Sequence, residues 1–239
     1  MKYRIQNMIR NMNPAVLVVL VLLIGNRFLN SNMGLGEWIY STLLMLPAII
    51  VALSFHEAAH GFMSHWLGDP TPKMQGRLTL NPASHIDPIG FLALLIAGFG
   101  WGRPVQINPA YYKNRRRDEF LVSIAGVATN FLLAVVAALL IKAFFGYGVS
   151  INSTMAYIIL EILLNFIIIN LVLMIFNLIP VPPLDGFGIV TQIFNLEKYD
   201  WYWKYYQNGH MILMLLIIFN ITDMIISPCV NALFALLIY

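Results

Sequence analysis

Long apolar segments alternate with short polar ones along most of the chain. A helix that crosses a bilayer needs about 20 mainly apolar residues. The segments expected to form such helices are 14–29, 38–67, 120–145, 155–179 and 211–239. The last is interrupted at Ser227-Pro228, so a partial final helix is expected to pack beside 211–226. The pattern predicts an all-α polytopic membrane protein with about five to six transmembrane helices.

A further apolar segment, residues 86–100, is short for a span and begins near Pro88. Lys and Arg residues gather at the N-terminus and in the loops 69–85 and 101–119, whereas the turn near 146–155 has none. Because positively charged loops stay in the cytosol, we place the N-terminus and both loops there. Segment 86–100 then has to leave and return on one side, so it is predicted to be re-entrant or interfacial.

The composition agrees with a bilayer as the surroundings of the chain. Of the 239 residues, 59% are hydrophobic and 10% are charged, and the mean hydropathy is +0.75. A soluble domain has about 25% charged residues. We therefore expect one membrane-embedded domain over 1–239. The net charge of +3 gives no reason to expect a nucleic-acid partner, and the single cysteine, Cys229, excludes an internal disulfide.

The stretch VALSFHEAAHGF, residues 51–62, puts ionisable groups into an apolar segment. On a helix, His56 and His60 share one face, so both imidazoles can bind one metal ion. Glu57 is offset from them and can reach a water on the metal instead. An ionisable group at membrane depth costs roughly 2.5–3.5 kcal/mol, and a divalent cation compensates the two imidazoles. The pattern therefore predicts the HExxH arrangement of a zinc hydrolase.

A catalytic zinc site needs a third protein ligand and one open position. Asp185 lies in a second polar group in apolar surroundings, NLIPVPPLDG, which by itself also suits an ordinary turn at the water interface. With 86–100 re-entrant, segment 155–179 runs inward, and Asp185 then reaches the cytosolic side near His56. A full crossing by 86–100 would put Asp185 at the opposite face of the membrane.

Four motifs follow one another along the chain: HEAAH in a membrane segment, GRLTLNPASHIDPIG after it, AGVATN opening a later span, and NLIPVPPLDG. This combination resembles the site-2 protease family of intramembrane zinc metalloproteases, in its compact branch without PDZ or CBS domains. The resemblance implies one Zn²⁺ per chain, held by His56, His60 and Asp185. It also implies that Glu57 is the general base or acid, and we expect it to act as the base toward a metal-activated water.

The resemblance implies roles for four more residues. Asn177 matches the family asparagine ahead of the LDG motif, which is expected to help hold substrate or the developing oxyanion. Gly126 would allow close helix packing, and Asn130 could hydrogen-bond across helices. His85 matches a position usual in this branch, and we expect a contact behind the ligands or an inhibitory contact rather than a metal ligand.

The resulting hypothesis is an intramembrane zinc endopeptidase that hydrolyses a peptide bond within or near the transmembrane helix of a membrane protein, as in regulated intramembrane proteolysis. Its core would span about 38–190, with peripheral helices 14–29 and 211–239. The segments RLTLNP and RPVQINP are expected to offer short β-like edges to an unwound substrate. The partners would be a transmembrane substrate and the lipid bilayer, with room for a regulatory membrane partner. We expect a multi-pass protein of the cell membrane, with the N-terminus and the active site toward the cytosol.

Two other classes of protein stay open. A membrane metal transporter or metal-binding protein would use the same three ligands, but it would tolerate Glu57→Gln, whereas a protease would keep zinc and stop cleaving. A prenyl-protein endopeptidase of membrane type needs a further Glu ligand downstream of HExxH. The candidate at membrane depth, Glu161, lies at the wrong end of its span.

Overall fold

The computed structural model describes residues 34–97, 100–145 and 154–239, so the predicted helix 14–29 lies outside the described part. The chain divides into two compact units. The smaller unit consists of the residues up to Leu43 and of Ile86–Gly102, and the larger unit consists of Leu44–His85 and Arg103–Tyr239. The expectation of one domain over the whole chain stays a prediction.

The smaller unit contains a short helix, α6 (Pro88–Ala97). Asp87 begins it, because its carboxylate accepts the backbone N–H groups of Ile89 and Gly90 at 3.0 and 2.9 Å. A helix of 10 residues rises about 15 Å, half the thickness of the hydrocarbon core. This length fits the expectation that 86–100 does not cross the membrane, and its re-entrant path stays a prediction.

The described residues contain no β-strand, and Ile86 and Gly102 form an isolated antiparallel bridge. The β-like edges expected in the loops therefore stay a prediction. Segment 69–85, expected to be a loop, contains two short helices, α4 (Thr71–Met74) and α5 (Pro82–His85).

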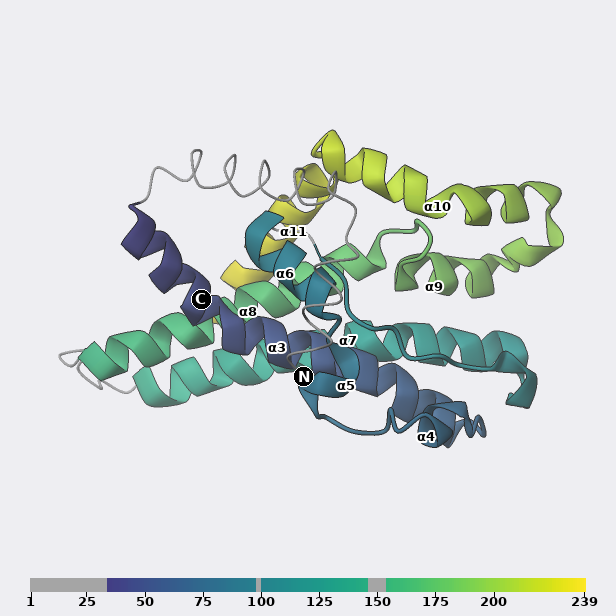
Figure 1. Cartoon of the computed structure of the whole chain (residues 1–239), viewed down its shortest axis with the longest axis horizontal. Coiled ribbons are helices and arrows are strands. Elements are labelled where there is room, and N and C mark those ends of the chain that lie inside the picture. Colours follow the sequence, from purple (N-terminus) through teal and green to yellow (C-terminus); the bar gives the residue numbers. More distant parts are fainter. Residues whose placement is uncertain (1–33, 98–99, 146–153) are drawn as a thin grey trace, which may run out of the picture. The chain divides into compact units, whose positions relative to one another are not determined.

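Long helices form most of the larger unit, and Figure 1 shows how they follow one another. Their bounds are α3 (Leu35–Trp66, with its start in the smaller unit), α7 (Arg115–Phe145), α8 (Thr154–Leu178), α9 (Asp185–Phe194), α10 (Asp200–Ile218) and α11 (Ile221–Ile238), with the short 3-10 turns η1 (Pro109–Tyr111) and η2 (Leu196–Lys198) between them. Among the described helices, α3, α7, α8 and α11 are long and apolar enough to cross a membrane. The described part is thus all-α with four candidate spans, and the count of five to six stays a prediction.

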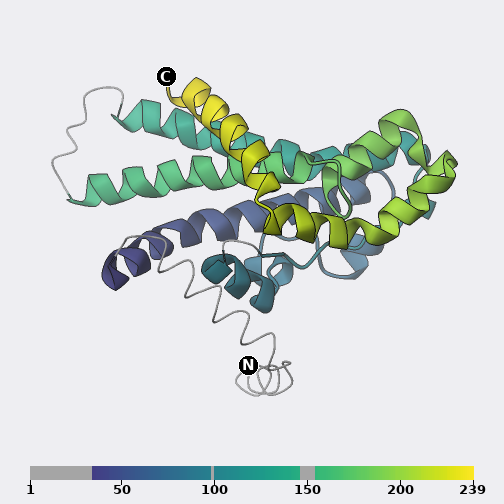
Figure 2. The same cartoon turned by 90° about the horizontal axis from the view of Figure 1, so that it is seen from above.

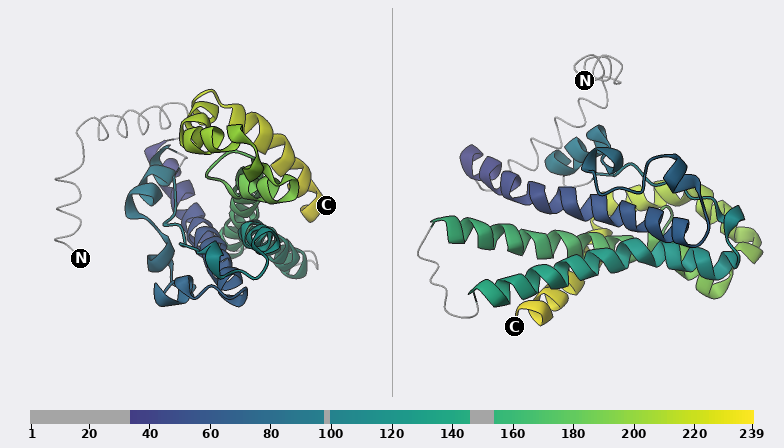
Figure 3. Two further views of the ribbon diagram at one scale, coloured as in Figure 1. Left: turned by 90° about the vertical axis from the view of Figure 1, so that its right-hand side faces the viewer. Right: turned by 90° about the horizontal axis from the view of Figure 1, so that it is seen from below.

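Helices α7 and α8 lie side by side as an antiparallel pair (Figure 2). Ala134 and Ala137 of α7 and Ile167 and Leu171 of α8 are almost fully buried in one apolar cluster. Small side chains let two backbones approach closely, which is how helices associate in a bilayer. In the right-hand view of Figure 3, this pair runs alongside the part of α3 that belongs to the same unit.

The break between α8 and α9 fixes the position of Asp185, the first residue of α9. Three prolines follow the end of α8 at Leu178, and proline cannot continue a helix. A Cβ at Gly186 would lie 2.2 Å from the carbonyl oxygen of Leu178, so glycine alone fits there. From α10, Tyr202 stacks on Phe187 with ring centroids 5.4 Å apart. The packing of Gly186 against α8 and of Phe187 against α10 therefore fixes the first turn of α9, which begins with Asp185.

The helix break near the C-terminus lies at Phe219 and Asn220, so the expected break at Ser227-Pro228 is wrong. Asn220 has a φ of 56°, a left-handed conformation that Asn adopts more readily than most residues. Pro228 lies inside α11, which continues past it to a length of 18 residues. Proline is tolerated within membrane-spanning helices, so it does not end this one.

Candidate metal centre

Helices α3 and α9 bring three donor atoms to one point in the larger unit. The Nε2 atoms of His56 and His60 are 3.1 Å apart, and each lies 3.3 Å from Oδ2 of Asp185. A tetrahedral zinc ion with bonds of about 2.0–2.1 Å separates its ligand atoms by roughly 3.3–3.4 Å. The structure therefore brings the three predicted residues together with the spacing that one zinc ion requires.

Hydrogen bonds behind the imidazoles leave both Nε2 atoms able to bind a metal. Nδ1 of His56 lies 2.7 Å from Oδ1 of Asn130, and Nδ1 of His60 lies 2.8 Å from the carbonyl oxygen of Val122. Both oxygens accept hydrogen bonds, so each Nδ1 carries the hydrogen and each Nε2 keeps a lone pair. Oδ2 of Asp185 is buried and receives no hydrogen bond. Three lone pairs that face one another in this way fit a cation between them.

Helix α7 leaves room for the imidazoles at Gly126. A Cβ at this position would lie 2.5 Å from Nε2 of His60 and 2.6 Å from Cε1 of His56. Non-bonded atoms prefer about 3.5–4.0 Å, so any side chain would displace the imidazoles. Asn130 of α7 contacts His56 of α3 by a hydrogen bond of 2.7 Å. The roles expected of Gly126 and Asn130 at the site stay predictions that this geometry supports.

Glu57 lies outside the three-residue group, and the segment 103–108 holds its side chain. Oε2 of Glu57 accepts the backbone N–H of Val105 at 3.0 Å. Further along, the backbone N–H of Asn108 donates to Oδ2 of Asp69 at 2.8 Å. Segment 103–108 is thus attached at two points to α3 and to the turn that follows it, and the first attachment orients the expected general base.

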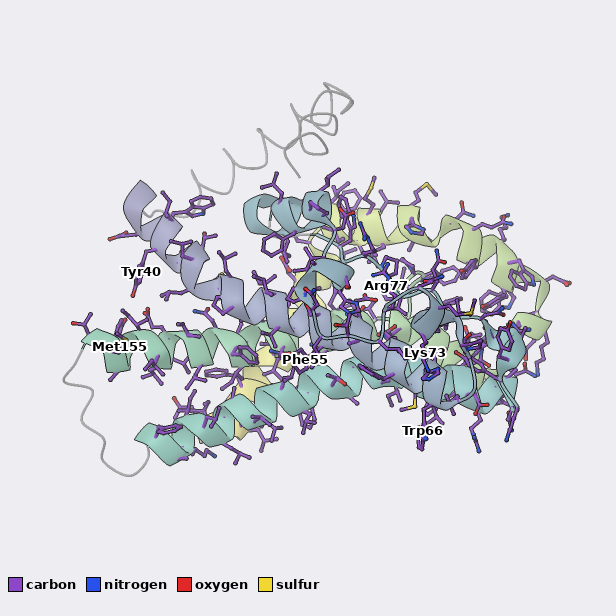
Figure 4. All side chains as sticks on the ribbon, turned by 60° about the horizontal axis from the view of Figure 1, so that its bottom comes forward. Tyr40, Phe55, Trp66, Lys73, Arg77 and Met155 are labelled. Carbon is purple, nitrogen blue, oxygen red and sulfur yellow. The ribbon has the colours of Figure 1, made fainter. Side chains whose placement is uncertain are left out.

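Arg77 ties segment 103–108 to the chain that follows α4. Its guanidinium donates to the carbonyl oxygens of Ser84, Arg103 and Pro104. Figure 4 shows Arg77 in the chain beyond α3, with Lys73 on α4. A guanidinium carries five N–H donors in a rigid plane, which suits it to bind several carbonyl groups at once. Arg77 therefore stabilises the segment that reaches Glu57.

Asp69 anchors the other end of that segment and is fully buried. Its carboxylate accepts hydrogen bonds from the Ser64 hydroxyl and from the backbone N–H groups of Thr71 and Asn108. Burial alone raises the pKa of this carboxyl, but the donors outweigh burial and hold the pKa below its ordinary value. Burial also raises the pKa of Tyr112, whose hydroxyl bonds to Ser64, to about 12. Asp69 is therefore ionised and Tyr112 neutral at neutral pH.

Two further predicted residues also lie outside the three-residue group. Asn177, near the end of α8, donates to the carbonyl oxygen of Leu173 at 3.0 Å. His85 is fully buried, and its Nε2 donates to the carbonyl oxygen of Thr79 at 2.7 Å. Nδ1 of His85 has no hydrogen-bond partner within the described residues. The roles expected of Asn177 and His85 stay predictions.

Sequence reasoning missed three contacts of this site. The carbonyl group of Val122 and the N–H group of Val105 belong to the backbone, so residue type does not reveal them. Asn170 of α8 is fully buried and bonds to Asn130. A polar side chain inside an apolar span is usually paired or functional, so the sequence carried a signal for Asn170.

Two imidazoles, a carboxylate and a neighbouring glutamate lie among helices long enough to cross a membrane. This arrangement defines the class of membrane-embedded metallohydrolases.

Comparisons with known proteins agree with this class. Residues 147–219 match the sequence profile of Peptidase family M50. YwhC of Bacillus subtilis is 39% identical over 163 residues, which cover 66% of this chain and 74% of the relative. The name of this relative assigns it provisionally to the zinc metalloproteases. Rip2 of Mycolicibacterium smegmatis, similarly named, is 29% identical over 204 residues, covering 82% of this chain and 72% of the relative. No solved structure matches the chain. The chain therefore belongs to peptidase family M50, the site-2 protease family of zinc metalloproteases.

Proposed function

We propose that this protein is an intramembrane endopeptidase in which His56, His60 and Asp185 hold one zinc ion and Glu57 is the general base. The observation that carries the proposal is the trio of donor atoms, 3.1 and 3.3 Å apart, with both Nδ1 hydrogens bound elsewhere. The substrate would be a membrane protein, cleaved within or near its transmembrane helix. A transporter would not need the glutamate that Val105 holds beside the site.

The chemistry divides between the metal and the chain. When bound, zinc supplies a Lewis acid that activates water and polarises the scissile carbonyl group. Glu57 takes a proton from the attacking water and passes it to the leaving amine. Because the N–H of Val105 occupies Oε2 of Glu57, the carboxylate is oriented before substrate arrives. Asn177 would help hold the substrate or the developing oxyanion.

The substrate has to unwind before cleavage, because a helix hides its carbonyl groups in hydrogen bonds four residues apart. An edge offered by segment 103–108 or by RLTLNP would hold the unwound stretch by backbone pairing. Gln106 and Ile107 are exposed between the attachment points at Val105 and Asn108, which supports this role for segment 103–108. The basic loops favour a site on the cytosolic side of the cell membrane, where a regulatory membrane partner could also act.

The test of this proposal compares the wild type with Glu57→Gln. Both proteins are purified, their zinc content is measured, and each is incubated with single-span transcription-factor or anti-sigma-factor substrates. Glu57→Gln is expected to keep its zinc and to lose about 10²–10⁴-fold in cleavage rate, since it removes general base catalysis. The control is Glu37→Gln, an exposed glutamate at the start of α3, which should cleave like the wild type.

Two outcomes would contradict the proposal. A Glu57→Gln protein that still cleaves excludes the glutamate as the base. The second outcome is zinc transport without cleavage. If the wild type and Glu57→Gln carry zinc across vesicle membranes equally well and neither cleaves the substrates, the site belongs to a transporter instead.

A further inference from the structure

Asn170 is a fully buried amide within the membrane-spanning helix α8. Its Nδ2 donates to the carbonyl oxygen of Phe166, one turn earlier in the same helix, at 2.8 Å. Its Oδ1 accepts a hydrogen bond from Nδ2 of Asn130 on α7 at 3.0 Å. A buried amide in a bilayer is costly unless both its ends are paired, and here both ends are paired.

Asn130 stands between Asn170 and the metal centre. One hydrogen of its Nδ2 goes to Oδ1 of Asn170, and the same nitrogen lies 3.2 Å from the carbonyl oxygen of Ala52 on α3. With both hydrogens committed, the amide has one orientation, in which Oδ1 faces Nδ1 of His56 at 2.7 Å. A rotation of the amide by half a turn would instead point an NH₂ group at His56.

The orientation of Asn130 decides which nitrogen of His56 carries the hydrogen. An acceptor opposite Nδ1 keeps the hydrogen there and leaves the Nε2 lone pair for the metal. A donor opposite Nδ1 would favour the form with hydrogen on Nε2, which faces Asp185 and cannot bind a cation. The three amide and imidazole groups thus form one hydrogen-bonded chain from α8 through α7 to α3.

We propose that Asn170 is a positioning residue for zinc: by accepting from Asn130, it holds the amide that keeps His56 ready to bind the metal. The proposal rests on the proposed role of His56 as a zinc ligand. It adds a residue of α8 to a centre whose ligands come from α3 and α9.

The test measures zinc affinity by competition with a chelator, and the visible spectrum of the Co²⁺-substituted protein, neither of which depends on cleavage. Asn170→Leu removes the acceptor, and a loss of about 10- to 100-fold in zinc affinity with a shifted Co²⁺ band is expected, as for other groups that orient a ligand. Asn170→Ser is the milder variant, because its hydroxyl can bond to the carbonyl group of Phe166 and keep α8 intact. It is too short to reach Asn130, so it should lose affinity as well.

Asn165→Leu is the matched control. Asn165 also lies on α8 and donates to a carbonyl group one turn earlier, that of Glu161, at 3.0 Å. Its replacement should affect helix stability in a similar way and leave zinc affinity and the Co²⁺ band unchanged.

A double-mutant cycle separates action through Asn130 from a general loosening of the fold. In an Asn130→Ala background, Asn170→Ser should cause no further loss of zinc affinity. The inference would be overturned if Asn170→Ser lowered zinc affinity as much in the Asn130→Ala background as in the wild type. It would also be overturned if folded Asn170→Leu or Asn170→Ser bound zinc with wild-type affinity. If the wild type itself binds no zinc, the proposed function fails instead, so the two failures are distinguishable.

Discussion

At the scale of single residues, the candidate metal centre depends on the lack of a side chain at Gly126 as much as on the three donor residues. The imidazoles of His56 and His60 fill the space in which a Cβ of residue 126 would lie. The ligands can therefore keep their positions only while glycine occupies that place on α7.

Gly126→Ala is expected to lose most bound zinc, because its methyl group would lie 2.5 Å from the metal-binding nitrogen of His60. The measurement is the zinc content of the purified protein. Gly61→Ala is the control, since the nearest neighbour of a methyl group there is a Val105 methyl at 3.4 Å, an ordinary contact. Equal zinc content in both variants would show that α7 can move away without cost.

Asp69 gives a prediction for pH. Its pKa is lower in the folded protein than its ordinary value, so its contribution to stability is present near neutral pH and disappears as the pH falls through the folded pKa. Asp69→Asn should therefore lower the unfolding temperature at pH 7 by roughly 5 °C. The difference from the wild type should shrink steadily below about pH 4. A difference that stays constant down to pH 2 would contradict this account.

The residues of the metal centre could be predicted because their chemistry depends on side-chain type and spacing. HEAAH points to His56, Glu57 and His60. The stretch around Asp185 by itself also suits an ordinary turn, so this residue was predicted from the charge-based topology and from the family resemblance. The parts that could not be predicted are backbone groups, such as the carbonyl group of Val122 and the N–H group of Val105. Their positions depend on tertiary packing, which leaves no mark on residue type.

At the scale of elements, segment 103–108 connects the smaller unit's end at Gly102 with the chain leading to α7. It holds Glu57 through one backbone N–H and Asp69 through another. The side chain of Gln106, between them, accepts from Gln75 at 2.8 Å. Substitutions in this segment therefore test whether it offers an edge for pairing with the substrate.

Proline at Gln106 or at Thr79 should lower cleavage several-fold and leave zinc content unchanged. Proline removes a backbone donor from the proposed edge at Gln106, and at Thr79 it breaks the hydrogen bond from the backbone N–H to the carbonyl oxygen of Arg77 that shapes the other edge. Turnover of a membrane substrate and zinc content are measured together. Gln106→Ala separates the loss of the side-chain contact with Gln75 from the loss of the N–H group. The edge proposal is wrong if neither proline variant changes turnover.

The helices themselves show where sequence patterns succeed. Uninterrupted apolar length predicted α3, α7 and α8, because a bilayer imposes that length on any spanning helix. The C-terminal break lies at Asn220 and not at Pro228, which is inside α11. A membrane helix tolerates proline, whereas the left-handed conformation of Asn220 turns the chain.

At the scale of the whole molecule, the distribution of Lys and Arg predicts which ends of the helices face the cytosol. Lys113 lies just before α7, and Met155 lies at the start of α8, the opposite end of the antiparallel pair (Figure 4). Both side chains are exposed. A helix of 31 residues rises about 46 Å, more than the hydrocarbon thickness, so we expect these two positions on opposite sides of a membrane.

Single cysteines at these positions test the orientation in a Cys229→Ser background. Lys113→Cys should react with a membrane-impermeant maleimide in inside-out vesicles but not in intact cells, and Met155→Cys should show the reverse. Cleavage activity serves as the control for folding. Labelling of Lys113→Cys from outside intact cells would reverse the assigned topology.

The proposed ligand set comes from two helices far apart along the chain, α3 with its imidazole pair and α9 with its carboxylate. Because a chain is synthesised from its N-terminus onward at about 5–20 residues per second, α3 is made several seconds before residue 185. A half-made chain therefore carries a histidine pair without its carboxylate partner. If Asp185 is the third zinc ligand, as proposed, hydrolytic competence would begin only when α9 docks against α3.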